Sequence, residues 1–320
     1  MRVKAAPLAA GWVVALLLHA AGAAAQETGG FDVSGASVPA EQILVGGPGR
    51  DGIRAIDEPG FAAPDEATWV EAANPVLGVV EGEEARTYPV HLIERHQIVN
   101  DEVNGVPLVV TYDPLAGSPR VFQRRIAGKT LSFGVSGLIY NHNFLLYDRE
   151  TESLWVQFTG EAISGPMVGK RLPPVRVRQE AFAVWRDRFP RTRVLERPDL
   201  HHIDYRQSPF LRYIVDDAAI FPVLASDDRF HQKEVVLGVV VDGKARAYLG
   251  SLMTAAGGRA EDEVAGRKIR LTYDPGEAVF TFDVPDDVAV EESYWLAWKA
   301  FHPDTDVWRD PGAAGKGEDG

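Results

Sequence analysis

The sequence LGVV at residues 77–80 occurs again at residues 237–240, and TYDP at residues 111–114 occurs again at residues 272–275. Two further words recur between these pairs in the same order, ARTY as ARAY and DEV unchanged. All four matches are separated by 160 or 161 residues. Single short words often match by chance, but four in one order at one spacing do not. The sequence therefore predicts two tandem copies of one unit.

The two copies are unequal in length. WRDRFPRTRV at residues 185–194 closes the first copy and is matched by WKAFHPDTDV at residues 298–307, but here the offset is only 113 residues. The second copy therefore lacks about 47 residues, which correspond to the stretch around residues 132–178, here called the insert. We expect a complete first repeat over residues 43–197 and a shortened second repeat over residues 198–309.

Short runs of β-forming residues, broken by turn residues, dominate the sequence. Helical patterns are fewer: one begins at Pro89 and continues through His96, one lies around residues 179–188, and one covers residues 291–300. We expect an α+β, β-rich fold of mostly antiparallel strands with a few short helices. The clearest strand candidates are residues 76–80, 108–112, 121–126, 130–135 and 153–158.

The first 25 residues have the three-part layout of a secretory signal peptide. Arg2 and Lys4 precede an apolar run over residues 8–18 and a small-residue stretch that ends at Ala25. The apolar run is shorter than the roughly 20 residues that cross a bilayer. We therefore expect cleavage, export to the periplasm or the exterior, and no membrane span in the mature chain. Residues 26–42 are expected to form a flexible leader, and residues 310–320 a disordered tail.

Charge and composition exclude several partners and chemistries. The net charge is −13, and loss of the signal peptide would make it −15, because two basic residues and no acid are removed. A surface this acidic repels nucleic acid and anionic membranes. The chain has no cysteine, which excludes disulfides, thiol nucleophiles and thiolate metal ligands. No sequence pattern identifies a cofactor.

Comparison of the two copies distinguishes residues needed for folding, which both copies share, from candidates for function, which only the complete copy has. Aromatic residues found in both copies, such as Tyr88 and Trp185, are expected in the cores. The window from residue 96 to residue 157, which contains much of the insert, is expected to hold any site. Its ligand-binding candidates are Asn100, Asp101, Tyr112, Ser118, Tyr140, Asn141, His142, Asp148, Arg149, Trp155 and Gln157.

Three residues in this window are candidates for catalysis: His96, Asp113 and Ser136. His96 has no counterpart in the second copy and is interpreted as a general base or metal ligand, with a solvated surface histidine as the alternative. Ser136 precedes Gly137 and is expected in a tight turn that exposes its hydroxyl, although the surrounding glycines do not fit G-x-S-x-G. For two ligand-binding candidates a structural interpretation is favoured: Asp148 as the cap of a β-turn and His142 as an exposed loop residue.

Six motifs occur in a fixed order: GPGRDGI at 47–53, RTYP at 86–89, IVND at 98–101, TYDPLAGS at 111–118, FGVSGL at 133–138 and YDRETESLWVQ at 147–157. Together they resemble a bacterial family called domain of unknown function 3179, over about residues 43–310. The family has no established activity. The family's motif with reactive side chains reads TYCPLCGS, with selenocysteine in some relatives. This motif implies thiol redox chemistry or soft-metal binding.

This chain departs from the family at the reactive positions. Asp113 and Ala116 stand where the two cysteines would be, so dithiol chemistry is excluded. Arg95 and Gln97 also differ from the tryptophan and glutamate that are usual in the family.

Two functions remain open. One is a ligand- or partner-binding module derived from a thiol-redox or soft-metal site that lost its cysteine pair. The other is a metal-assisted or acid/base, hydrolase-like enzyme that uses Asp113 with His96 as base or hard-metal ligand. Asp274 repeats Asp113 in a copy without the insert. Asp113 is therefore interpreted partly as a turn former before Pro114, which favours the binding function.

Overall fold

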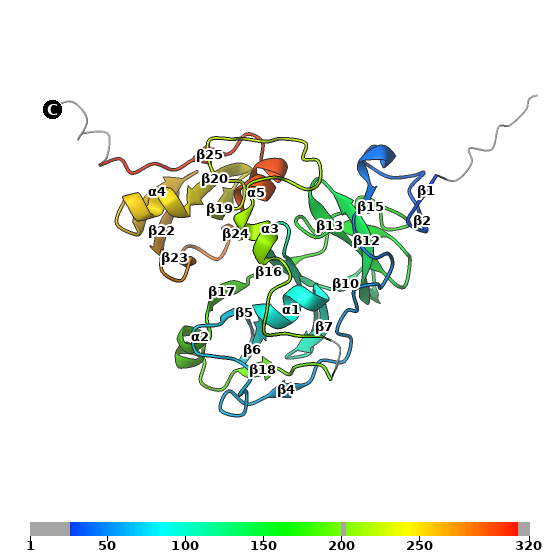
Figure 1. Cartoon of the computed structure of the whole chain (residues 1–320), viewed down its shortest axis with the longest axis horizontal. Helices are drawn as coiled ribbons and strands as arrows, with labels where there is room; N and C mark the ends of the chain where they lie inside the picture. The colour runs from blue at the N-terminus through cyan, green and yellow to red at the C-terminus, as the bar shows by residue number, and fades with distance from the viewer. Residues whose placement is uncertain (1–25, 200–202, 313–320) are drawn as a thin grey trace, which may run out of the picture.

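The computed structural model describes residues 26–199 and 203–312, and it is built mainly of β-sheets with a few short helices (Figure 1). Most strand pairs are antiparallel, which confirms the predicted β-rich, mostly antiparallel class. The predicted signal peptide lies outside the described residues, as do residues 313–320 of the predicted tail. Each large sheet is named below after one of its strands.

The β5 sheet contains the words LGVV and ARTY. Its strand order is β17-β5-β6-β18-β4, and β18 runs parallel to β6. Trp185 of helix α2 lies against Gly78, where a Cβ atom would be 2.2 Å from the indole ring, so this position requires glycine. The elements are β4 (Phe61–Ala62), β5 (Pro75–Glu81), β6 (Glu84–Pro89), β17 (Arg178–Ala181), α2 (Phe182–Arg188) and β18 (Arg193–Leu195).

The β8 sheet follows helix α1 and has the order β16-β9-β8-β7. Helix α1 ends at His96 because Gln97 is left-handed, with φ of 61°, and donates its N–H to the Ile93 carbonyl. Strand β8 is buried along most of its length and ends at Asp113. The elements are α1 (Val90–His96), β7 (Ile98–Val103), β8 (Val106–Asp113), β9 (Ser118–Gln123) and β16 (Pro174–Val175).

The second half of the chain contains two sheets whose strand orders resemble those of the β5 and β8 sheets. The β19 sheet has the order β24-β19-β20-β25, with β25 parallel to β20, and the β22 sheet has the order β21-β22-β23. Trp298 lies against Gly238 as Trp185 lies against Gly78. The elements are β19 (Val235–Val241), β20 (Lys244–Leu249), α4 (Gly250–Ala255), β21 (Arg259–Val264), β22 (Arg267–Asp274), β23 (Val279–Asp283), β24 (Ala289–Tyr294), α5 (Trp295–Phe301) and β25 (Asp306–Val307).

The β13 sheet is formed mainly by the insert, in the order β15-β14-β13-β12-β3. Its central hairpin turns at Asn141 and His142, whose φ angles of 50° and 62° are those of a type I′ turn. The elements are β3 (Leu44–Val45), β12 (Phe133–Tyr140), β13 (Asn143–Asp148), β14 (Leu154–Val156) and β15 (Ala162–Ser164), with the small pair β10 (Arg125–Ile126) and β11 (Lys129–Thr130) before them.

The five sheets contact one another in a closed ring, an arrangement like that of a five-bladed β-propeller. Shared clusters of buried apolar side chains join the β5, β8, β13, β19 and β22 sheets in that order. Arg178 closes the ring, because its guanidinium lies 4.2 Å from the centre of the Phe282 ring on β23. A backbone hydrogen bond of 2.7 Å from Tyr294 to Ala116 also joins the β19 sheet to the β8 sheet.

Three expectations are corrected by the structure. Residues 26–42 are not a flexible leader, because they bury Phe31 and Val33 against the β13 sheet and form β1 (Glu27–Thr28), β2 (Phe31–Asp32) and the 3-10 helix η1 (Ala40–Gln42). The helices expected over residues 179–188 and 291–300 begin only at Phe182 and Trp295. In each case the preceding residues pair as an edge strand, which the helical pattern alone did not separate.

Residues 204–233, here called the strap, connect the two halves and contain helix α3 (Leu211–Val215). Arg95 of α1 donates to the carbonyls of Asp204 and Gln207, and the strap's Leu224 donates its N–H to Asn141. The strap therefore passes from α1 to the β12–β13 hairpin. Within residues 26–199 and 203–312, no helix has the length and apolar character that crossing a bilayer requires.

Candidate functional site

Asp113, at the end of β8, lies in a buried set of hydrogen bonds. Its Oδ1 accepts from the N–H groups of Leu115 and Ala116, at 2.9 and 3.4 Å. Its Oδ2 accepts from Asn143 Nδ2 at 2.7 Å and from the N–H of Phe144 at 2.9 Å. Burial raises the pKa of Asp113 to about 6, although the four donors oppose this rise. The carboxylate is 0% exposed, so its contacts are made within the protein.

Asp274 occupies the equivalent position at the end of β22. Its Oδ1 accepts from the N–H groups of Gly276 and Glu277 at 2.8 and 3.4 Å, the same two positions along the turn. Both aspartates therefore cap the turn that follows their strand. Asp274 is exposed, however, and only Asp113 receives the second pair of donors, which comes from the insert.

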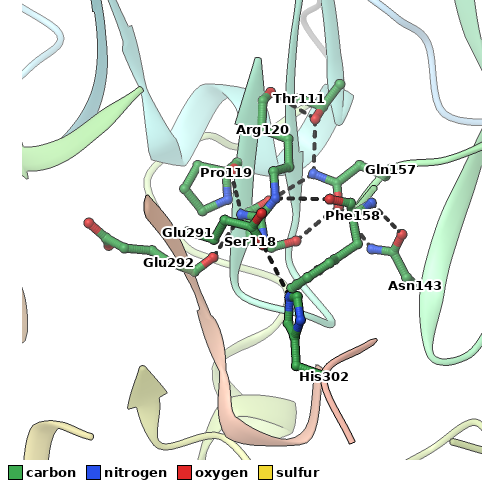
Figure 2. A network of polar contacts seen from close by, with 10 residues as sticks. All are labelled: Thr111, Ser118, Pro119, Arg120, Asn143, Gln157, Phe158, Glu291, Glu292 and His302. Carbon is green, nitrogen blue, oxygen red and sulfur yellow. Dashed lines mark hydrogen bonds and ion pairs between the residues drawn. The ribbon is translucent and has the colours of Figure 1, made fainter. Parts of the chain in front are cut away.

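Asn143 continues the buried polar network from this carboxylate toward β9 (Figure 2). Its Nδ2 also donates to Gln157 Oε1 at 2.9 Å, and its Oδ1 accepts from the N–H of Phe158 at 2.8 Å. Gln157 donates to Thr111 Oγ1 and to the Ser118 carbonyl, and accepts the Ser118 hydroxyl, all at 2.9 Å. Fully satisfied buried networks of this kind fix one arrangement of the strands that they join.

Arg120, on β9, links the first half of the chain to β24 (Figure 2). Its guanidinium donates to the Glu292 carbonyl at 2.9 Å and to Glu291 Oε2 at 3.1 Å. Its Nε donates to the Phe158 carbonyl at 3.1 Å, and its guanidinium carbon lies 4.1 Å from the centre of the Phe158 ring. The side chain is buried, so these contacts hold the two halves of the chain together without competition from water.

A cleft of about 450 Å³ opens beside Arg120, between β9, β16 and β24. The stacked rings of Phe158 and Phe301, with centroids 4.5 Å apart, form part of its wall. His302 also lines it and places Nε2 3.6 Å from Glu291 Oε2. Valines cover much of the remaining wall, and Arg176 and Asp286, which form an ion pair of 3.2 Å, also line the cleft. A volume of this size falls within the usual range for small-ligand sites.

His96 lies apart from Asp113 in a set of contacts of its own. Its Nδ1 is 2.7 Å from the Arg54 carbonyl, and its Nε2 is 2.7 Å from the hydroxyl of Tyr205 in the strap. Because a carbonyl can only accept, Nδ1 carries the proton and Tyr205 donates to Nε2. His96 is buried, not solvated, and burial lowers its pKa. It shares no hydrogen-bond partner with Asp113.

Ser136 is buried within β12, so the expectation of an exposed hydroxyl in a tight turn is wrong. The hydroxyl donates to the Leu145 carbonyl at 2.5 Å and accepts the N–H of Leu138 at 3.0 Å. The residues around it continue as a strand with a bulge, and Gly137 takes a φ of 78° there. A Cβ atom on Gly137 would lie 2.6 Å from the backbone of Gly49, which explains the glycine.

His142 was expected as an exposed loop residue, and it is fully buried. Its Nε2 is 2.9 Å from the Tyr213 hydroxyl, and its Nδ1 is 2.9 Å from the Phe221 carbonyl. Asn141, beside it in the turn, donates to the Ala300 carbonyl at 2.9 Å. The strap and α5 pack over the hairpin and exclude water from both side chains.

Asn100 and Arg149 meet at Asp57. The Asn100 Nδ2 and the Arg149 Nη1 each lie 2.8 Å from Asp57 Oδ1. Asn100 also exchanges hydrogen bonds of 2.8 and 2.9 Å with the backbone of Phe133, so it joins β7 to β12. The contacts with Phe133 join two strands, whereas Asp57 and Arg149 lie in the segments between strands.

Asp148 and Trp155 form a further separate set. The Asp148 carboxylate accepts the N–H of Thr151 at 2.6 Å and the indole N–H of Trp155 at 2.9 Å. Asp148 thus caps the turn between β13 and β14. Tyr112 is buried at the end of β8, and Tyr140 is half-buried against the core of the β13 sheet.

Asp101 and the equivalent residue of the second half, Asp262, each accept a hydrogen bond from a tyrosine hydroxyl. Asp101 accepts the hydroxyl of Tyr88 at 2.6 Å, as Asp262 accepts that of Tyr248 at 2.7 Å. The predicted site residues therefore lie in several separate sets, most of them buried, of which one unites Asp113, Ser118 and Gln157. None of the predicted site residues lines the cleft.

The family model described as Protein of unknown function (DUF3179) matches residues 50–285. This is more than half of the chain. The chain belongs to the DUF3179 family. Comparison with curated proteins and with solved structures finds no match. The DUF3179 match contains Asp113, the insert and Arg120, and it ends before Glu291 and His302 on the other side of the cleft.

Sequence reasoning missed the residues that form the cleft. Arg120 lies two residues after Ser118, and Phe158 directly follows Gln157. The sequence therefore indicated this region through Ser118 and Gln157, which belong to the DUF3179 motifs, but not Arg120 and Phe158 themselves. Glu291 and His302 belong to the second half, where no site was expected. Among the described residues, no group of three or more histidine, aspartate or glutamate side chains is placed to hold a metal ion.

Proposed function

We propose that this DUF3179 member is a binding protein that takes a small amphipathic molecule in the cleft between β9, β16 and β24. The observation that carries the proposal is the position of the stacked Phe158–Phe301 pair beside Arg120 in an open cleft. Aromatic faces and valines offer apolar area, and the guanidinium of Arg176, which is 3.2 Å from Asp286 Oδ1 in the unliganded protein, would exchange this contact for an anionic head group.

The acid/base alternative has less support. A general base must reach the proton that it abstracts, directly or through one water. Asp113 is buried and accepts four hydrogen bonds, and His96 is held by Arg54 and Tyr205 at a separate place. No observation brings the two side chains to one substrate.

The binding protein is further proposed to descend from a site with a cysteine pair. The support is that TYDPLAGS keeps the rest of the family's motif and that Asp113 and Ala116 are both fully buried in its turn. In such an ancestor the N–H groups that now hold the aspartate would favour a thiolate at the same position.

The two halves are proposed to be unequal copies of one unit. The support is the shared order of four strands, β17-β5-β6-β18 and β24-β19-β20-β25, in which the fourth strand is parallel to the third, and the matched hydrogen bonds from Trp185 to Thr192 and from Trp298 to Thr305, both 2.9 Å. Export to the periplasm or the exterior is proposed from residues 1–25 alone. Mass spectrometry of the protein recovered from its producing cell tests export, since cleavage predicts a chain that begins at Gln26.

The binding proposal is tested with 8-anilinonaphthalene-1-sulfonate, an aromatic anion whose fluorescence rises in an apolar site. We expect saturable binding at one site, weakened about tenfold by Phe301→Ala, which corresponds to a loss of about 1.4 kcal/mol. Val184→Ala, which removes an exposed valine of α2, is the matched control and leaves the affinity unchanged. Circular dichroism verifies that each variant is folded. Equal affinity of wild type and Phe301→Ala contradicts the proposal.

A further inference from the structure

Four N–H donors converge on the two oxygens of the Asp113 side chain. Leu115 and Ala116 donate to Oδ1, and Phe144 and the side chain of Asn143 donate to Oδ2. Neither an ion pair nor a hydrogen bond from a cationic group to this carboxylate occurs in the described part of the chain. The negative charge is thus held by neutral dipoles, as in protein sites for small oxyanions.

The donors on the insert side are fixed by contacts other than those with Asp113. Asn143 Oδ1 accepts the N–H of Phe158 at 2.8 Å, and the second hydrogen of its Nδ2 points to Gln157 Oε1 at 2.9 Å. These two contacts determine that the amide presents its nitrogen, not its oxygen, to residue 113. Phe144 is held in β13 by pairing with Ile139. The donors are therefore preorganised for an anion.

The second half of the chain shows what the same turn does without the insert. Among the described residues, Asp274 accepts hydrogen bonds only from Gly276 and Glu277, and its side chain is exposed. A turn of this kind therefore forms with two N–H donors to the aspartate and without burial of its carboxylate. The extra donors and the enclosure at Asp113 exceed the requirement of the turn.

We propose that the donors around Asp113 form a binding site for a small carboxylate, and that this chain fills the site with its own side chain. An alanine at position 113 leaves a space in which formate can take the places of the two carboxylate oxygens. This site is separate from the cleft, so the inference does not depend on the proposed function.

The test is chemical rescue of Asp113→Ala with sodium formate. Urea unfolding is measured at increasing formate, with sodium pivalate, a carboxylate too large for the space, at equal ionic strength. We expect formate to stabilise the variant saturably. At ten times the dissociation constant, the ratio of folded to unfolded chains rises about elevenfold. Asp274→Ala is the matched control, because its turn is open to water and lacks the second pair of donors.

If Asp113→Ala does not fold in buffer alone, its refolding yield is measured in formate and in pivalate. A yield restored by formate only supports the site. The inference is overturned if formate stabilises Asp113→Ala no more than pivalate does, or no more than it stabilises wild type and Asp274→Ala. Binding of the fluorescent probe in the cleft is unaffected by either result, so the two proposals fail separately.

Discussion

Asn143 Nδ2 lies 2.7 Å from Asp113 Oδ2, and this contact joins the insert to the turn at the end of β8. The equivalent turn in the second half has no such partner and stays exposed. The insert therefore changes the environment of an aspartate that both halves share. It does so with uncharged donors, which leaves the carboxylate with a pKa of about 6 because burial outweighs the hydrogen bonds.

This contact predicts different effects for two substitutions of Asn143. Asn143→Ala leaves buried acceptors on Asp113 and Gln157 with fewer donors, at a cost of about 1–3 kcal/mol in the free energy of unfolding. Asn143→Asp places a second carboxylate against the first and destabilises more at pH 8, where both are ionised, than at pH 5. Urea unfolding at the two pH values measures both. Equal losses for the two variants at pH 8 contradict the described contact.

Arg120 is expected to hold the two halves together through its fixed fork of donors. Arg120→Lys retains the charge but cannot reach Phe158, Glu291 and Glu292 at once. We expect a loss of about 1–3 kcal/mol in the free energy of unfolding, because buried acceptors are left without partners. Arg171→Lys, whose side chain is 64% exposed and pairs with Glu161 in the same half of the chain, should change stability by less than about 1 kcal/mol. Thermal and urea unfolding of both variants decide whether this difference exists.

Glu292 should make the stability of the folded chain depend on pH, and the direction of its pKa shift gives the sign. Burial raises its pKa to about 8, whereas the unfolded value is near 4.5. The folded chain therefore binds more protons than the unfolded chain between these values, so stability falls as the pH rises toward 8 and levels off above it.

Glu292→Gln removes this titration and places at β24 the residue that the first half has at the equivalent position, Gln179. Between pH 6.5 and 8, above the pKa of Asp113, wild type should lose about 2 kcal/mol more than the variant. Urea unfolding across this range measures the difference. Parallel curves for the two proteins would show that Glu292 does not carry the raised pKa.

The strap should open when its tyrosine contacts are removed. Tyr213 donates its hydroxyl to the Leu115 carbonyl at 2.7 Å and lies 2.9 Å from His142 Nε2. Tyr213→Phe removes both hydrogen bonds, so trypsin should cleave after the neighbouring Arg212 about fivefold faster, as expected for a loss of about 1 kcal/mol. Tyr273→Phe, outside the strap, serves as control. An unchanged cleavage rate would mean that apolar packing alone holds α3.

The sequence predicts the scaffold better than the site, for physical reasons. Short runs of β-forming apolar residues and the repeated motifs LGVV and TYDP place β5 and β8, because such a run bounded by turn residues is a local pattern. A helix begins later than predicted where an edge strand runs directly into it, as at Phe182. Phe31 shows how one aromatic residue in a polar segment can anchor that segment to a core.

The site depends on contacts that no local pattern carries. The Arg120–Glu291 ion pair joins residues 171 positions apart. Asp113 and Asp274 lie in the same four-residue motif, TYDP, but the insert, the strap and β24 pack around the turn at Asp113, so that Asp113 is buried and Asp274 is exposed. The rule that a site must lie in the complete copy excluded Glu291 and His302, although a cleft formed between two halves takes its wall from both.

The central claim is that a small amphipathic molecule binds in the cleft beside Arg120. It is tested most directly by two-dimensional NMR of the ¹⁵N-labelled protein during titration with 8-anilinonaphthalene-1-sulfonate. Binding in the cleft should produce saturable shifts that concentrate at amides lining it, among them Phe158, Val290 and Phe301. Shifts confined to the exposed apolar residues of the strap, Leu211 and Val215, with the cleft amides unchanged, would contradict it.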